Sequence, residues 1–168
     1  MRKLSNIVVG LVLAAAFALS VSAQTFSTAN GTKVDLAANR GKVVVLAVGA
    51  TWLPLSAKQA EYANTLARRY SGKDVVVYFV ATDSNVPKSK NYAADADITK
   101  FATANRMTIS VLRDSDGAYT LKEYRIDQLP SFVILDKQGR LVGDPFGGID
   151  PKFDITVPIS KEIDRLLK

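Results

Sequence analysis

Two apolar runs, separated by one helical pattern, constrain the fold of this chain more than any other feature. The runs cover residues 43–48 and 75–80, and neither contains a charged side chain. Uninterrupted apolar strands are typical of a sheet that is covered on both faces. Between them, apolar side chains recur at helical spacing over residues 54–70. A strand, a helix and a second strand predict a right-handed crossover and a parallel strand pair.

Shorter elements are predicted around this unit. Residues 82–96 are polar and contain Pro87, which is typical of a long loop. Residues 131–135 form a further apolar strand, and an apolar stripe beginning near Pro158 predicts a C-terminal helix. This order of elements predicts an α/β fold in which helices flank a central sheet. The other expected elements are a hairpin over residues 25–36 with its turn at Asn30-Gly31, a helical turn over 35–39, a helix over 97–105 with Asp97 as its N-cap, a short edge strand over 109–112, a brief helix over 119–124, and a hairpin turn over 136–139 followed by a return strand over 140–142.

The N-terminus, residues 1–23, has the pattern of a secretory signal peptide. Arg2 and Lys3 precede an uncharged apolar stretch over residues 7–19, and Val21-Ser22-Ala23 has the small residues that signal peptidase accepts. The alternative is a membrane anchor, but the apolar stretch is short for a span of ~20 residues. We therefore expect cleavage after Ala23 and a periplasmic or secreted protein with no further membrane association.

Composition excludes several classes of function for the expected mature domain, residues 24–168. The chain contains no cysteine and no histidine, so it has neither a thiol nor the commonest general base and transition-metal ligand. We accordingly expect no metal and no cofactor. Without Arg2 and Lys3 the formal charge falls from +6 to +4, and cations alternate with acids, as in residues 161–165. We expect no nucleic-acid binding, because no basic stripe is present, and a monomer.

Four motifs in the same order resemble the TlpA/redoxin type of the thioredoxin-like superfamily, whose members are thiol-disulfide oxidoreductases. They extend over most of residues 24–168. The resemblance implies a thioredoxin-like fold with a central mixed β-sheet flanked by helices. The motifs are RGKVVVL at 40–46, ATW at 50–52, VLRDSDG at 111–117 and LPSFVILDKQGRLV at 129–142.

The chain departs from the family pattern at the reaction centre. In such proteins the ATW motif continues into two cysteines separated by two residues, and these positions fall on Leu53 and Ser56. Leucine has no ionisable atom, and a serine nucleophile needs a nearby base. By the same resemblance, Ala47 stands where a buried acid or amide is common and Gly49 where an aromatic is common. We therefore expect no thiol-redox enzyme activity.

The resemblance also implies a cis peptide bond before Pro130 and a loop that faces the former cysteine positions. An apolar platform beside such a loop predicts a non-catalytic site for a protein or peptide partner. An alternative is that residues 82–96 fold over the platform and bury it. Two other roles stay open: an inactive or accessory component of envelope redox homeostasis or cytochrome maturation, and a structural subunit of a larger envelope complex. The expected binding residues are Trp52, Leu53, Pro54, Leu55, Leu129, Pro130 and Ser131.

Two further patterns have simpler interpretations. Residues 114–117, DSDG, match half of a calcium loop, but the twelfth position, where glutamate is required, holds Arg125. An Asp-Gly turn is the better interpretation. Ser56 and Lys58 are two residues apart on a predicted helix and point to different faces, which disfavours a catalytic dyad.

Overall fold

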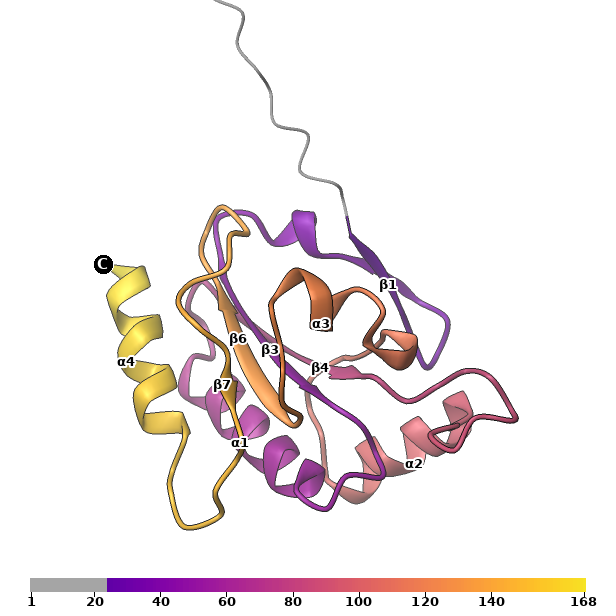
Figure 1. Cartoon of the computed structure of the whole chain (residues 1–168). Coiled ribbons are helices and arrows are strands. Elements are labelled where there is room, and N and C mark those ends of the chain that lie inside the picture. The colour runs from indigo at the N-terminus through magenta and orange to yellow at the C-terminus, as the bar shows by residue number, and fades with distance from the viewer. Residues whose placement is uncertain (1–23) are drawn as a thin grey trace, which may run out of the picture.

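The computed structural model describes residues 24–168, which form one mixed β-sheet with helices on both faces (Figure 1). The sheet has seven strands in the order β2-β1-β5-β4-β3-β6-β7. The strands are β1 (Thr25–Thr28), β2 (Lys33–Asp35), β3 (Val43–Gly49), β4 (Val75–Ala81), β5 (Val111–Arg113), β6 (Ser131–Leu135) and β7 (Phe146–Gly147). The helices are α1 (Ser56–Arg69), α2 (Asp95–Ala104), α3 (Thr120–Glu123) and α4 (Thr156–Leu167), with short 3-10 turns η1 (Leu36–Asn39) and η2 (Ser115–Gly117).

The centre of the sheet is β3, which pairs in parallel with β4 and antiparallel with β6. Every residue of β3 is buried. Alternate side chains enter two cores because successive residues of a strand point to opposite faces. Val45 packs on one face with α1 and α4, and Leu46 packs on the other with the segment that contains α3. The predicted parallel crossover and the predicted α/β arrangement are confirmed.

Helix α1 forms where the apolar spacing places it. Ala60, Ala63 and Leu66 are fully buried against the sheet. Arg68 and Arg69 occupy the last turn, where cations favour the negative end of the helix dipole. The helix begins at Ser56, two residues later than the sequence indicates, because Pro54 lies in the turn that precedes it.

Two predicted elements lie elsewhere than expected. The strand near residue 111 is not at an edge, because β1 pairs with β5 and extends the sheet by the β1–β2 hairpin. Helix α2 begins two residues before Asp97, so Asp97 is not the N-cap. Its carboxylate instead accepts a hydrogen bond from the Ala94 backbone N–H at 3.2 Å, in the first turn.

The predicted return strand over residues 140–142 is also wrong. Only one isolated bridge forms there, between Leu135 and Leu141. Gly143 then adopts a left-handed φ of +65°, which ends the pairing because strand residues need extended backbone. The chain returns to β6 further on, where Phe146 pairs with Phe132 as β7.

The expected signal peptide lies outside the described residues. Within residues 24–168, no helix combines the length and the apolar character that a membrane crossing needs.

Candidate functional site

The site lies where β3 ends and α1 begins, beside the loop that precedes β6. The β3–β6 register sets Val48 opposite Ser131, so the start of β6 lies next to the residues that follow β3. The Leu129–Pro130 peptide bond in this loop is cis. Pro130 and Ser131 are buried, and Leu129 is half-buried. The fold therefore brings residues 129–131 to the β3–α1 junction, 72 residues away along the chain, where Gln59 binds Ser131.

The junction presents apolar side chains to solvent. Trp52 is 56% exposed, and residues 82–96 leave it uncovered. Pro54 is exposed, whereas Leu53 and Leu55 are half-buried and Leu55 packs against the core. The name groove is used below for one set of residues, the exposed side chains at 52–55 and the loop at 129–131, of which Pro130 and Ser131 are buried. An open apolar junction agrees with the binding site expected from sequence, whose function stays a prediction.

Ser56, at the second former cysteine position, is fully buried. Its hydroxyl donates a hydrogen bond of 2.6 Å to the Ala50 carbonyl oxygen. A carbonyl oxygen does not accept the proton as a general base would, so this contact does not activate the hydroxyl. Lys58 is engaged elsewhere, because its ammonium group binds Glu61 at 2.8 Å and lies over the Tyr62 ring. The geometry gives Ser56 a structural role at the helix start.

Gln59 ties α1 to both strands at the site, and the sequence analysis missed it. Its side-chain amide nitrogen donates to the carbonyl oxygens of Val48, at 3.0 Å, and Ser131, at 2.8 Å. The side chain is fully buried. Two carbonyl acceptors fix the amide orientation, because the amide oxygen cannot take the place of the donor. The signal in the sequence was a long polar side chain at the helical spacing of the buried alanines of α1.

Gly49 makes room for that glutamine. A Cβ atom on Gly49 would lie 2.3 Å from the Gln59 amide oxygen and 3.4 Å from the Ser56 hydroxyl. The first distance is a severe clash. The missing side chain at residue 49 and the buried amide of Gln59 are therefore two parts of one packing arrangement.

Asp83 holds the other side of the junction and was also missed. Its buried carboxylate accepts hydrogen bonds from the Thr51 backbone N–H, at 3.0 Å, and from the Thr51 hydroxyl, at 2.6 Å. The next contact along is from the Thr82 N–H to the Gly49 carbonyl, at 2.7 Å. Hydrogen bonds of this kind offset the cost of burying a carboxylate. They fix the ATW motif to the end of β4.

Comparison with known proteins identifies the family to which this architecture belongs. Residues 18–152 match the family model described as Redoxin. The chain belongs to the Redoxin family.

A curated relative matches this Redoxin domain in sequence. The thiol-disulfide oxidoreductase ResA of Bacillus thuringiensis subsp. konkukian (strain 97-27) is 28% identical over 112 residues, which are 67% of this chain and 59% of ResA. This chain therefore spans less than two thirds of the length of that relative.

Two solved structures are similar over nearly the whole domain. A protein assigned as thiol:disulfide interchange protein DsbE from Chlorobium tepidum has a TM-score of 0.71 at 20% identity, covering 87% of this chain and 94% of that one. The pneumococcal exposed lipoprotein thioredoxin Etrx1 from Streptococcus pneumoniae strain TIGR4 has a TM-score of 0.69 at 23% identity, covering 86% and 100%. The predicted thioredoxin-like fold, with both cysteine positions replaced, is confirmed.

Asp114 has a structural role in this Redoxin domain. Its carboxylate accepts hydrogen bonds from the Thr120 N–H and hydroxyl, both at 2.7 Å, and so fixes the start of α3. Within residues 24–168, no group of three or more histidine, cysteine, aspartate or glutamate side chains is placed to hold a metal ion.

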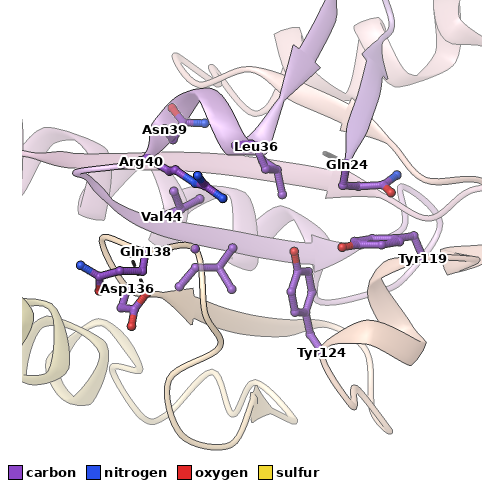
Figure 2. Close-up of a pocket in the computed structure, with 12 residues that line it drawn as sticks. Gln24, Leu36, Asn39, Arg40, Val44, Tyr119, Tyr124, Asp136 and Gln138 are labelled. Atoms are coloured by element: carbon purple, nitrogen blue, oxygen red, sulfur yellow. Dashed lines mark hydrogen bonds between the residues drawn. The ribbon is translucent and has the colours of Figure 1, made fainter. Parts of the chain in front are cut away.

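A separate hollow lies at the other end of β3, on the face that carries α3 (Figure 2). Val44, Leu135 and Arg40 are among the residues that line it. The Tyr124 hydroxyl points into it and the Tyr119 hydroxyl points toward Tyr124. Its volume is about 40 Å³, which is room for a few water molecules. We therefore assign it to core packing around the two tyrosines, whose rings meet edge to face with centroids 5.9 Å apart.

Tyr124 is expected to make the stability of the domain fall at alkaline pH. Burial raises the pKa of its hydroxyl well above the ordinary value. In the unfolded chain a tyrosine hydroxyl ionises at about pH 10. Below that pH, burial of the neutral Tyr124 hydroxyl therefore costs no stability through ionisation, and above it the free energy of unfolding declines as the pH rises. Urea unfolding between about pH 8 and pH 11 should show a shallower decline for Tyr124→Phe than for the wild type. Tyr92→Phe, at an exposed position, should follow the wild type; equal slopes for all three proteins would contradict the assignment.

Proposed function

We propose that this Redoxin-family domain is a non-catalytic binding module, whose groove receives an extended segment of a partner protein. The observation that carries the proposal is the 56% exposure of Trp52 at the β3–α1 junction, in a chain without any sulfur nucleophile. A dithiol cycle requires two sulfur atoms, and the one hydroxyl at the former cysteine positions is bound to the Ala50 carbonyl. What is left at the site is an apolar surface held by Gln59 and Asp83.

Two separate observations support export of the domain. The N-terminal sequence has the pattern of a cleaved signal peptide, and Etrx1, which has a similar fold, is described as an exposed lipoprotein. We propose that the mature domain acts outside the cytoplasm, in the periplasm or after secretion. Cleavage after Ala23 should be visible as an N-terminal Gln24 in mass spectrometry of the exported protein.

A second candidate rests on the relationship to ResA, which is named a thiol-disulfide oxidoreductase. In this alternative the domain is an accessory component of an envelope redox pathway and binds a partner without exchanging thiols with it. Both candidates use the groove, and they differ in whether the partner itself carries a redox-active cysteine pair.

Substitution of Leu53 by aspartate tests the binding role. Trp52 is the only tryptophan of the chain, so its fluorescence reports occupancy of the groove directly. The probe is a phage library of random peptides about twelve residues long, a length that covers the groove and its surroundings in extended form. Selected peptides should shift Trp52 emission, and Leu53→Asp should weaken them roughly thirtyfold, because a carboxylate would have to be buried.

Val86→Asp is the matched control, because it places the same charge at an apolar side chain that is 53% exposed in the loop after β4. It should leave the affinity unchanged. The proposal is wrong if no selected peptide changes Trp52 emission, or if Leu53→Asp binds as tightly as the wild type.

A further inference from the structure

Most of the net positive charge of the described residues comes from α1, α4 and two residues near them, and one further carboxylate, that of Asp154, lies close enough to interact with Lys58 and Arg69. The α1–α4 surface consists of the charged residues of α1 and α4 together with Lys168 and Arg106. It carries seven cations and three carboxylates, whereas the remaining described residues carry thirteen of each. Its members are Lys58, Glu61, Arg68, Arg69, Arg106, Lys161, Glu162, Asp164, Arg165 and Lys168.

Part of this surface is a shelf along the outer side of α1. Lys58, Arg68 and Arg106 line an open depression of about 410 Å³. Asn64 fixes the geometry: its side-chain nitrogen donates to the carbonyls of Asn105 and Arg106, at 3.3 and 3.1 Å, so the end of α2 stays against α1. The shelf is therefore a built feature of the fold and places two arginines from distant segments side by side.

The charge of the shelf is largely uncompensated within the protein. Glu61 pairs with Lys58 at 2.8 Å. Among residues 24–168, no carboxylate lies within ion-pairing distance of Arg68 or Arg106. Both arginines are exposed. An anionic chain on the shelf would meet these two guanidinium groups without displacing an internal carboxylate.

The shelf follows the groove residues along the chain. Helix α1 starts at Ser56, directly after the exposed junction, and Lys58 is in its first turn. From Lys58 to Arg68 the helix advances about 15 Å, which about five residues of extended peptide would cover. A segment anchored at Trp52 and directed along α1 would therefore need about five further residues to pass from Lys58 to Arg68.

We infer that the partner segment is acidic: an apolar anchor occupies the groove, and aspartate or glutamate residues on one side of the anchor follow the shelf to Arg68 and Arg106. The inference rests on the proposed function and adds the chemical class of the partner. A protein segment fits better than nucleic acid, since no aromatic side chain lines the shelf itself to stack on bases. It also fits better than a membrane, since the shelf exposes no large apolar side chain.

The peptide selection described above tests this inference separately from the groove itself. Peptides that shift Trp52 emission should be enriched in aspartate and glutamate on one side of an apolar centre. Reversing two charges, Arg68→Glu with Arg106→Glu, should weaken such peptides about tenfold at low ionic strength, mainly through slower association. Lys137→Glu is the control, because it also replaces a cation by a carboxylate, but beyond the end of β6 that is far from Ser131. It should have little effect on peptide affinity.

The neutral pair Arg68→Gln with Arg106→Gln should show a smaller loss of peptide affinity. Because this variant introduces no carboxylate, its loss cannot result from new negative charge at the end of α1. Groove-binding peptides without an acidic bias, or peptides that bind equally to the charge-reversed protein, would overturn the inference and leave the binding role intact. A failure of every peptide to shift Trp52 emission would overturn both.

Discussion

Replacing Leu53 and Ser56 by cysteine is expected to give this domain the dithiol–disulfide cycle that it lacks. The Ser56 N–H donates to the Leu53 carbonyl at 3.1 Å, which closes a tight turn between the two residues. Such a turn holds its first and last Cα atoms within about 7 Å, and a disulfide spans Cα distances of about 4.4–6.8 Å. The two new sulfurs should therefore meet without a change of backbone path.

The surroundings favour distinct roles for the two sulfurs. Residue 53 is half-buried, so its thiolate would be the one that attacks a substrate, whereas residue 56 is fully buried and would resolve the mixed disulfide. The start of α1 favours the thiolate form at both positions. Gly49 leaves space beside residue 56, because the Ser56 hydroxyl is 3.4 Å from where a Cβ on Gly49 would lie.

The measurement is reduction of insulin by dithiothreitol, together with a count of free thiols before and after oxidation. The wild type should stay at background, and Leu53→Cys/Ser56→Cys should accelerate the reaction and lose both thiols on oxidation. Leu53→Cys/Leu55→Cys is the control, because two side chains that are two residues apart point in different directions and should not form a disulfide. A double variant that folds but keeps both thiols after oxidation would show that the junction no longer has the geometry of a redox site.

The elements predicted correctly from sequence are those that local patterns determine. The β3–α1–β4 unit follows from apolar periodicity within about forty residues. The position of β5 does not, because its pairing with β1 joins Ser27 to Arg113 across the chain. The same reason explains the missed edge strand β7, whose partner Phe132 gives no local signal that Phe146 will return to it.

The site shows the same division more sharply. The apolar junction could be found from the ATW motif and the two replaced cysteine positions. Gln59 and Asp83 could not be found in this way, because the partners that explain them are 72 and 32 residues away along the sequence. A sequence motif identifies the positions at which the family places its reactive side chains. The residues that hold the site in place are recognised only from their hydrogen bonds in the structure.

Gly49→Ala is expected to destabilise the domain by about 2 kcal/mol, as overpacking of a core does. The clash is with the end of the Gln59 side chain, which would ordinarily move aside. Here it cannot, because the amide nitrogen is bound to Val48 and Ser131. The backbone of Gly49 is not in the left-handed region, so alanine is excluded there only by the glutamine.

Gln59→Ala alone should cost about 3 kcal/mol, since it removes two hydrogen bonds and leaves a cavity. In the double variant, Gly49→Ala/Gln59→Ala, the new methyl group would meet no amide and would partly fill that cavity. The double variant should therefore be more stable than the sum of the single effects predicts, by at least about 1 kcal/mol.

Urea unfolding of the four proteins measures this coupling. Gly147→Ala is the matched control, because its Cβ would lie 3.5 Å from the nearest heavy atom, an ordinary contact. It should change the free energy of unfolding by no more than about 0.5 kcal/mol. Strictly additive effects at Gly49 and Gln59 would mean that the two residues are independent. Coupling would show that the absent side chain on β3 and the buried amide on α1 form one packing arrangement.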